Sequence, residues 1–202
     1  LFTIGDVSGK GSSAAFYMAQ CMSLVRYSKQ FTTDPKEISQ RLNNYFAASV
    51  TDRQIFVTAV IGILDTKKNT INFIRAGHTE PIFIPGDNEK EIQVIESRGI
   101  GIGLTKNYGI FEKSLKSYSI SLKPGDSIVF YTDGVVEASL HQLGIETEAE
   151  MYGEERLQNL LTRFRDKSAD YILKEIEFDI ESFYAGNPRV DDHTVLVIQR
   201  VR

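Results

Sequence analysis

The middle of this chain is rich in predicted strands, whereas both ends carry helical patterns. Residues 54–132 contain many β-branched and aromatic side chains and are interrupted by short polar turns, which predicts a series of antiparallel strands. Amphipathic patterns lie on both sides of this segment, and the apolar run 194–201 predicts a closing strand. Helices gathered at the two ends of a strand-rich segment are typical of an α+β fold with mostly antiparallel sheets.

Four helices are predicted from apolar side chains that recur at spacings of three and four residues. Ser12 or Ser13 can cap the first helix. In the second helix, Asp34 is the expected N-cap, Pro35 the first helical residue and Glu37 the reciprocal capping partner. The expected apolar faces are Ala15, Met18, Ala19, Met22 and Val25; Ile38, Leu42, Tyr45 and Phe46; Leu157, Leu160, Leu161 and Phe164; and Ile172, Ile176, Ile180 and Phe183.

Polar turns separate several of the predicted strands. Residues 65–69 are expected to close a hairpin, and Pro124 with Gly125 marks a second turn. The expected strands are residues 1–4, 54–64, 70–75, 81–84, 91–95, 112–122, 126–132 and 194–201.

Length and composition indicate one globular domain that spans residues 1–202. The chain is 42% hydrophobic, enough for a sizeable core, and it contains no repeat or linker that would divide it. Charged residues make up 25% of the chain and the net charge is −4, with Lys and Arg scattered along the sequence. This distribution argues against a nucleic-acid partner, which usually requires a basic patch.

The single cysteine, Cys21, permits no disulfide within the chain and fits a reducing cytoplasm. Its place in an apolar helical pattern favours a small buried side chain over a nucleophile. No apolar run reaches the roughly 18 residues of a membrane span, and no signal peptide is visible. The full-length protein could still be tethered to a membrane through another segment. Because Leu1 already lies in a strand-like run, we expect a fragment whose upstream part is missing.

Aspartates lie at the ends of several predicted strands. Asp6 and Asp133 each follow a strand, and Asp191 and Asp192 come just before the closing strand. In an antiparallel sheet the end of one strand lies beside the start of its neighbour, so these sites can converge on one sheet edge if the strand order allows it. Taken alone, each is also explained by turn chemistry or by a solvated loop. Their position against apolar strands, where charge is otherwise avoided, favours a shared site.

Carboxylates that converge repel one another, and hard divalent cations offset that repulsion. Mg²⁺ and Mn²⁺ prefer oxygen ligands. Two such ions about 4 Å apart can lower the pKa of a bridging water and orient it for in-line attack on phosphorus. Such chemistry needs no nucleophile from the protein.

Other motifs fit the sequence less well. Gly5 and Gly9 are separated by three residues rather than the four of a P-loop, and the glycines at 99, 101 and 103 lack the spacing of a dinucleotide fingerprint. The three histidines show no zinc-type spacing. A Ser-His-Asp triad stays open, although nothing resembles a nucleophile elbow.

Nine short segments occur in a distinctive order. They are Gly5-Asp6-Val7-Ser8-Gly9-Lys10-Gly11, Ala14-Ala15, Phe56-Val57-Thr58, Ala76-Gly77-His78, Gly101-Ile102-Gly103-Leu104, Pro124-Gly125-Asp126, Tyr131-Thr132-Asp133-Gly134-Val135-Val136-Glu137-Ala138, Tyr152-Gly153 and Asp191-Asp192-His193-Thr194. Together they resemble the SpoIIE/RsbU-type bacterial branch of the type-2C-like metal-dependent protein phosphatases. The match covers nearly the whole chain.

The resemblance implies two packed antiparallel β-sheets flanked by helices, an α-β-β-α sandwich with a metal site at one end. It implies that Asp6 contacts two Mn²⁺ or Mg²⁺ ions, that the Val7 carbonyl helps to hold one, and that Asp133, Asp191 and Asp192 complete the shell. The implied partners are a phosphorylated protein such as an anti-sigma-factor antagonist, a sensor domain upstream in cis and, as a further possibility, a second copy in a homodimer. One feature departs from the family, because its acidic strand before the first motif is absent from residues 1–202.

Three further residues have two interpretations each. His78 of the Ala-Gly-His segment can be a structural histidine that donates to a loop carbonyl or a proton shuttle. Arg75 and Arg98 can contact a substrate phosphate, although solvated surface arginines are the commoner case.

The leading hypothesis is a cytoplasmic, Mn²⁺- or Mg²⁺-dependent phosphatase in bacterial signalling that hydrolyses phosphoserine or phosphothreonine on a partner protein. One alternative is a phosphatase-like binding or regulatory module with weak or no catalysis. A third hypothesis is an unrelated phosphohydrolase that acts on a small molecule.

Overall fold

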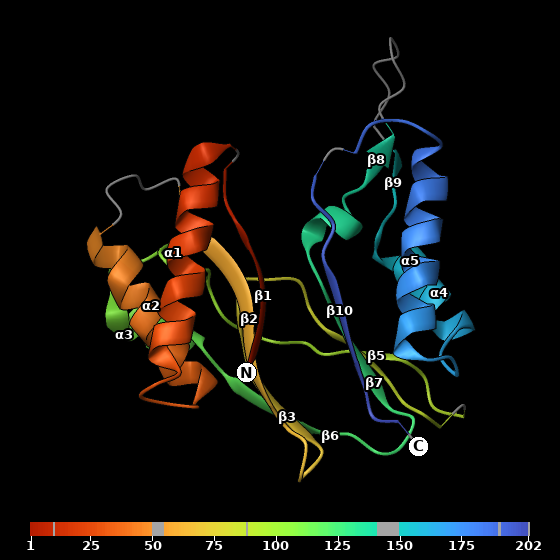
Figure 1. The fold of residues 1–202 in the computed structure, drawn as a ribbon, viewed down its shortest axis with the longest axis horizontal. Coiled ribbons are helices and arrows are strands. Elements are labelled where there is room, and N and C mark those ends of the chain that lie inside the picture. Colours follow the sequence, from red (N-terminus) through yellow and green to blue (C-terminus); the bar gives the residue numbers. More distant parts are fainter. Residues whose placement is uncertain (10, 50–54, 88, 141–149, 190, 202) are drawn as a thin grey trace. The chain divides into compact units, whose positions relative to one another are not determined.

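The computed structural model describes residues 1–9, 11–49, 55–87, 89–140, 150–189 and 191–201. Within these ranges the chain forms five α-helices and two four-stranded antiparallel sheets, which confirms the α+β class. The chain divides into two compact units, a first unit of Leu1–Glu80 with Glu96–Ser121 and a second unit of Pro81–Ile95 with Leu122–Arg202. Each unit contains one of the sheets and the helices that cover it (Figure 1).

The sheet of the first unit has the strand order β1-β2-β3-β6. Its strands are β1 (Phe2–Val7), β2 (Val57–Asp65), β3 (Thr70–Ala76) and β6 (Ser117–Ser121). The predicted polar turn joins β2 to β3, where the Asp65 carboxylate accepts hydrogen bonds from the backbone N–H groups of Lys67 and Lys68. The predicted hairpin is therefore confirmed.

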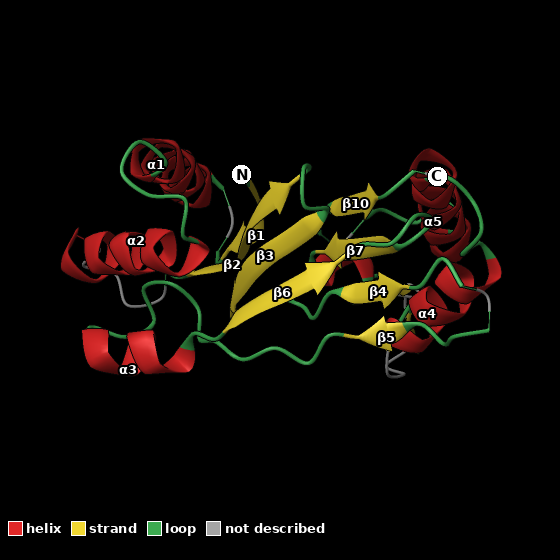
Figure 2. Cartoon of the chain, turned by 90° about the horizontal axis from the view of Figure 1, so that it is seen from below, coloured by secondary structure: helices red, strands yellow, loops and turns green. Residues whose placement is uncertain are grey.

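Three helices cover one face of this sheet (Figure 2). They are α1 (Ser12–Ser28), α2 (Pro35–Ser49) and α3 (Tyr108–Ser114). Successive side chains of a strand point to opposite faces, and Val57, Ala59 and Ile61 of β2 join the helices in one buried cluster. Its fully packed members are Val25, Ile38, Leu42, Phe46, Val57, Ala59, Ile61, Ile74, Ala76, Ile102, Phe111 and Leu115.

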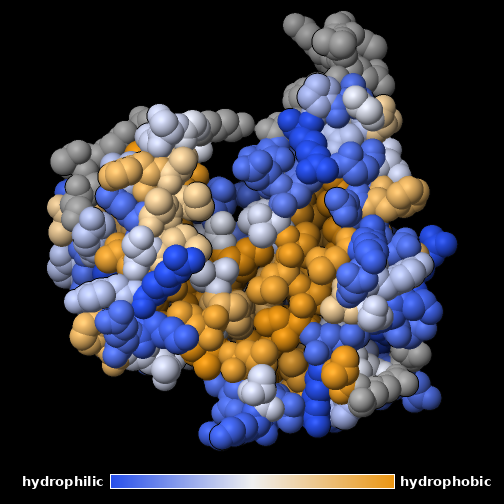
Figure 3. Space-filling model, viewed as in Figure 1, coloured by the Kyte–Doolittle hydropathy of each residue, from blue (hydrophilic) through white to orange (hydrophobic). Residues whose placement is uncertain are grey.

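The apolar face predicted for α1 is largely wrong. Met18 and Met22 are 51% and 40% exposed, and only Val25 of the predicted set is buried. Figure 3 shows apolar side chains on the exposed side of this helix. Because apolar residues occur all round α1, their spacing could not identify the buried side. The helix contacts the core through Tyr17, Cys21, Leu24 and Val25.

Helix α2 begins as predicted, with Asp34 as its N-cap. The Asp34 Oδ1 atom accepts a hydrogen bond of 2.9 Å from the backbone N–H of Lys36. The reciprocal partner is Thr32 rather than Glu37, because the backbone N–H of Asp34 donates to Thr32 Oγ1 over 3.1 Å. Glu37 instead forms an ion pair with Arg41 one turn further along the helix.

The sheet of the second unit has the strand order β10-β7-β4-β5. Two helices, α4 (Glu154–Arg163) and α5 (Ala169–Tyr184), cover one of its faces (Figure 2). Their predicted apolar faces are confirmed as part of a second buried cluster. The strands are β4 (Ile82–Ile84), β5 (Gln93–Val94), β7 (Ser127–Tyr131) and β10 (Val195–Gln199).

A polar and aromatic cluster joins α4 to α5. Arg156 binds both carboxylate oxygens of Asp179, at 2.8 Å from Nε to Oδ2 and 3.0 Å from Nη2 to Oδ1. The Tyr152 hydroxyl donates to Asp179 Oδ2 over 2.8 Å, and the guanidinium lies over the rings of Tyr152 and Phe183. The bonds from Arg156 and then from Tyr152 hold the pKa of Asp179 below its ordinary value.

The turn before β7 depends on a buried carboxylate. Asp126 is 6% exposed, and its two oxygens accept hydrogen bonds from the backbone N–H groups of Gly86 and Lys123, at 2.8 and 2.7 Å. The Pro-Gly-Asp segment thus ties this turn to the end of β4, which is a structural role rather than a catalytic one.

Several local features differ from the sequence-based expectation. Helix α3 occupies the start of the predicted strand 112–122, so β6 begins only at Ser117. The N-cap of α1 is Gly11 with no side-chain cap, so neither Ser12 nor Ser13 has the expected role. Two short paired strands, β8 (Ser139–Leu140) and β9 (Glu150–Met151), were not predicted. In the described part of the chain, no helix has the length and apolar character to cross a bilayer.

Candidate metal centre

Two of the predicted acidic segments lie side by side in the second unit. Strands β7 and β10 are antiparallel neighbours, and Tyr131 at the end of β7 pairs with Val195 at the start of β10. Just beyond this pair, the Thr132 N–H donates to the Thr194 carbonyl and the Thr194 N–H donates to Thr132 Oγ1, each over 3.0 Å. Asp133 therefore leaves one strand where the Asp191-Asp192 segment enters the other, as the antiparallel argument predicts.

Gly134 allows these two segments to approach closely. A Cβ atom at this position would collide with the backbone carbonyl oxygen of Asp192 and would lie 3.4 Å from Cβ of Asp191. Gly134 belongs to a short 3₁₀ turn, η1 (Asp133–Val135). The glycine after Asp133 is therefore required by contact with the second acidic segment and not only by local turn chemistry.

The carboxylates of these segments are accessible and keep acceptor capacity. Asp133 is half-buried, whereas Asp191 and Asp192 are exposed. Asp133 Oδ1 accepts from the Gly134 N–H over 3.0 Å, and Asp191 Oδ1 accepts from the Asp192 N–H over 2.8 Å. Within the described residues, each of these two carboxylates makes this one hydrogen bond. Its second oxygen accepts none there. Oxygen ligands of this kind fit Mg²⁺ or Mn²⁺.

His193 anchors the second acidic segment to the end of α5. Its Nε2 atom lies 3.1 Å from the Tyr184 hydroxyl, and the two rings stack with centroids 5.6 Å apart. Burial, and next the charge of Arg189, lower the pKa of His193. The sequence offered no signal for this anchor beyond the position of His193 beside two aspartates.

Asp6 belongs to the sheet of the first unit. The predicted strand ends at residue 4, but β1 continues through Asp6 to Val7. Asp6 is exposed and pairs with Thr58 of β2. The strand order therefore does not place Asp6 on the sheet edge of the other acidic segments, because β1 belongs to one sheet and β7 and β10 to the other.

The segment after Asp6 is held by the start of β2. The Ser8 N–H donates to the Phe56 carbonyl over 2.9 Å, and the Phe56 N–H donates to Ser8 Oγ over 2.8 Å. Val7 pairs with Val57, and its side chain packs on the buried helix-side cluster. These bonds bring the segment that contains Asp6 next to the Phe56-Val57-Thr58 segment.

The described residues of neither unit gather three or more His, Cys, Asp or Glu side chains in a cluster suited to a metal ion. Asp133, Asp191 and Asp192 supply oxygen donors from the second unit, and Asp6 and the Val7 carbonyl supply them from the first. Of the predicted ligands, three therefore belong to the second unit and two to the first.

Arg75 is not a solvated surface arginine, because its guanidinium is bound within the protein. Its side chain is only 17% exposed and pairs with Glu80 at 3.6 Å. The guanidinium also donates to the carbonyls of Ser97 and His78 and to Ser97 Oγ. Arg98, in contrast, is exposed.

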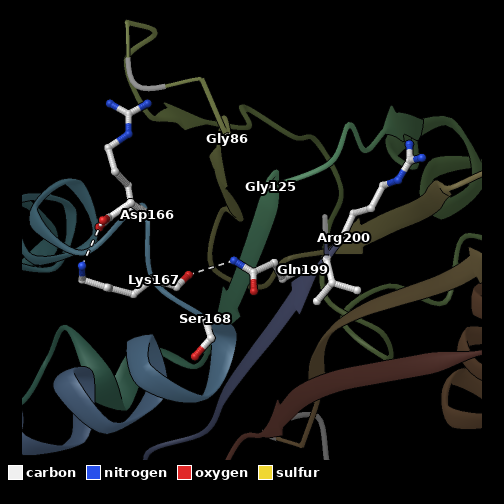
Figure 4. A pocket seen from close by; sticks show the side chains of 9 residues that line it. Gly86, Gly125, Asp166, Lys167, Ser168, Gln199 and Arg200 are labelled. Carbon is white, nitrogen blue, oxygen red and sulfur yellow. Dashed lines mark hydrogen bonds and ion pairs between the residues drawn. The ribbon is translucent and has the colours of Figure 1, made fainter.

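A pocket in the second unit lies away from the acidic segments (Figure 4). Its volume is about 190 Å³, and Lys167 and Gln199 are among the residues that line it. Gln199 pairs with Ser127 at the start of β7, whereas Asp133 follows the other end of that strand. Lys167 pairs with Asp166, and the Gln199 amide bonds to the Lys167 carbonyl, so these polar groups already stabilise the protein itself.

Comparison with known proteins identifies the family. The family described as Stage II sporulation protein E (SpoIIE) matches residues 1–201, and the chain therefore belongs to the SpoIIE family. Protein IcfG of Synechocystis sp. is 29% identical over 98% of this chain and 33% of its own length. Phosphoserine phosphatase RsbU of Bacillus subtilis is 27% identical over 98% of this chain and 54% of its own length. The chain thus spans about a third and about half of these relatives.

Solved structures support the fold. The SiaA-PP2C domain of Pseudomonas aeruginosa superposes with a TM-score of 0.78 at 15% identity, over 98% of this chain and 73% of that one. The catalytic domain of serine threonine protein phosphatase PstP, in complex with two manganese ions, gives a TM-score of 0.63 at 12% identity, over 99% and 87% of the two chains. The fold is therefore that of PP2C-type phosphatase domains, and one such domain binds divalent metal.

Proposed function

We propose that this chain is the catalytic part of a protein phosphatase that hydrolyses phosphoserine or phosphothreonine on a partner protein in bacterial signalling. The observation that carries the proposal is the contact between the Asp133 turn and the Asp191-Asp192 segment, which Gly134 makes possible. Membership of the SpoIIE family and the likeness to phosphoserine phosphatase RsbU support the same chemistry.

The proposed cofactor is a pair of Mn²⁺ or Mg²⁺ ions. Asp6, the Val7 carbonyl, Asp133, Asp191 and Asp192 are the proposed ligands. When bound, divalent cations lower the pKa of coordinated water and neutralise charge on phosphoryl oxygens. The residues of this chain supply the carboxylate oxygens and hold the backbone of the acidic segments in place. In the second unit, the Thr132–Thr194 hydrogen bonds and the contact of His193 with Tyr184 do this.

The proposed substrate is a phosphorylated signalling protein, such as an anti-sigma-factor antagonist. A sensor domain in cis and a homodimer belong to the same proposal. The single cysteine and a phosphoprotein substrate favour a cytoplasmic site of action.

The substitution Asp133→Asn in the full-length protein tests the proposal. It replaces one ligand oxygen by an amide of the same shape, so we expect Mn²⁺-dependent release of phosphate from a phosphoserine protein to fall at least about a hundredfold with an unchanged circular dichroism spectrum. Asp87→Asn, an exposed aspartate beside a loop of the second unit, is the matched control. Unchanged turnover in Asp133→Asn would contradict the proposal.

A second candidate is a phosphatase-like module that binds a partner without catalysis. Calorimetry with Mn²⁺ separates the candidates, because a pure binding module has no reason to bind metal through Asp133. Comparing turnover of an aryl phosphate with that of a phosphoprotein separates both from a small-molecule phosphohydrolase.

A further inference from the structure

The Ala76-Gly77-His78 segment places a buried imidazole beside the strand that pairs with Asp6. His78 is 5% exposed, and its Nδ1 atom lies 3.1 Å from Thr58 Oγ1. Thr58 is the residue directly opposite Asp6 in the register of β1 and β2. Residues directly opposite each other in an antiparallel pair have Cβ atoms about 4.5–5.5 Å apart on the same face. The Thr58 hydroxyl therefore lies next to the imidazole, and Thr58 is the direct cross-strand neighbour of Asp6.

Thr58 and Asp6 share the face of the sheet that the helices do not cover. Val57 and Ala59, the neighbours of Thr58, belong to the cluster on the helix side, as does Val7, the neighbour of Asp6. Side chains alternate along each strand, so Thr58 and Asp6 point to the other face. A hydroxyl at this position is on the correct face to donate a hydrogen bond to the Asp6 carboxylate.

The backbone of His78 is fixed by several contacts. Arg75 donates to its carbonyl while also binding Ser97 and Glu80. Gly77 has a φ of 71° and forms a bridge to Ala59, and a Cβ at Gly77 would lie 2.7 Å from the Gly101 nitrogen. The imidazole consequently has a defined position beside β2, and Arg75 holds the backbone of His78 in place.

We propose that His78 is a positioning residue that orients the Asp6 carboxylate through the Thr58 hydroxyl. This inference rests on the proposed function, in which Asp6 binds the metal ions. An ionised carboxylate only accepts hydrogen bonds, so in the proposed arrangement Thr58 donates its hydroxyl proton to Asp6. The Thr58 oxygen then accepts from His78, which requires that Nδ1 carries the imidazole proton. The chain of hydrogen bonds runs from His78 to Thr58 to Asp6.

Two substitutions of His78 separate this role from simple space filling. An Asn side chain can place an N–H donor near the position of Nδ1, whereas a Gln side chain places its amide near that of Nε2. His78→Asn therefore keeps a donor to Thr58 and His78→Gln removes it. Thr58→Val removes the hydroxyl itself with little change of shape. Thr3→Val is the matched control, because Thr3 lies in the same strand pair on the helix-side face and bonds to the Val60 carbonyl.

The first readout is Mn²⁺ affinity of the full-length protein by calorimetry. Groups that orient a metal ligand typically contribute ten- to a hundredfold to metal affinity. We expect Thr58→Val and His78→Gln to weaken Mn²⁺ binding by about tenfold or more, His78→Asn to restore most of the loss, and Thr3→Val to have no effect. Equal affinities for His78→Asn and His78→Gln, or for Thr58→Val and Thr3→Val, would overturn the inference.

The second readout needs no metal. The ¹⁵N chemical shifts of the His78 ring in the metal-free protein report which nitrogen carries the proton, and we expect it on Nδ1. A proton on Nε2 alone would contradict the hydrogen-bond chain even if Mn²⁺ binds. If the unaltered protein neither binds Mn²⁺ nor releases phosphate, the proposed function fails, and the ring tautomer still decides between the two directions of the His78–Thr58 bond.

Discussion

Gly134 packs directly against the backbone carbonyl of Asp192, and this contact joins the two acidic segments of the second unit. Neither segment indicates a site by itself, since an Asp-Gly pair and an Asp-Asp pair both occur in ordinary turns. Their contact places Asp133 and Asp191 at the same end of neighbouring strands. The proposed metal site depends on this packing as much as on the carboxylates themselves.

Adding a side chain at Gly134 should disturb the proposed site. We expect Gly134→Ala to force the two segments apart, to lower the free energy of unfolding by about 1–3 kcal/mol and to reduce Mn²⁺ affinity. Denaturant titration and calorimetry measure the two effects. The control is Gly109→Ala in helix α3, where a new Cβ meets no atom closer than 3.4 Å and alanine favours the helix. Wild-type stability and Mn²⁺ affinity in Gly134→Ala would show that the close approach is not required.

The link between α4 and α5 should make the protein sensitive to acid. The pKa of Asp179 is lowered in the folded state, chiefly by Arg156. A lowered folded pKa stabilises the protein above the unfolded value of about 4, and the contribution disappears as pH falls through the folded pKa. We expect Asp179→Asn to cost about 1–2 kcal/mol at pH 7 and to flatten the decline of stability below about pH 4.

Denaturant titrations between pH 7 and pH 2 check this prediction. Arg156→Ala should cause a similar loss at pH 7, because Asp179 then loses its bidentate partner and the rings of Tyr152 and Phe183 lose the guanidinium that lies over them. Lys174→Ala breaks an exposed ion pair with Asp170 and should change stability by less than about 0.5 kcal/mol. A pH dependence that is the same with and without the Asp179 carboxylate would count against the assignment.

Cys21 should react slowly with thiol reagents. Burial raises the pKa of its thiol to about 11, so little thiolate is present near pH 8. We expect alkylation by iodoacetamide to be much slower in the folded protein than in denaturant, and Cys21→Ala to retain phosphatase activity. Mass spectrometry over time measures the modification. Rapid modification of the folded protein, or loss of activity in Cys21→Ala at unchanged stability, would revive a reactive role for the thiol.

The amphipathic helices could be predicted where one side alone is apolar. The stripes of α4 and α5 are buried as expected, and so is that of α2 except for Tyr45, which is 37% exposed. The buried face of helix α1 was predicted wrongly because the helix carries apolar residues on several sides. Periodicity then cannot tell which side contacts the sheet. Helix α3 was missed because its seven residues are too few to establish a period.

The site was predictable to the extent that neighbouring strands determine it. Asp133 and the Asp191-Asp192 segment meet because β7 and β10 are antiparallel neighbours, which the strand-end argument anticipates. The placement of Asp6 in the other sheet depends on strand order, which local patterns do not encode. The hydrogen-bond partners of Arg75 could not be predicted either, because Ser97 lies 22 residues further along the chain and local patterns do not show this contact.

Calorimetric titration of the full-length protein with Mn²⁺ addresses whether Asp6 and Asp133 hold the same cations. The unaltered protein is compared with Asp6→Asn, Asp133→Asn and the double variant. We expect each single substitution to weaken binding by about tenfold or more, and the double variant to lose less than the sum of the two losses, since ligands of one site are coupled. Unchanged Mn²⁺ affinity in both single variants would contradict a metal centre built from these two aspartates.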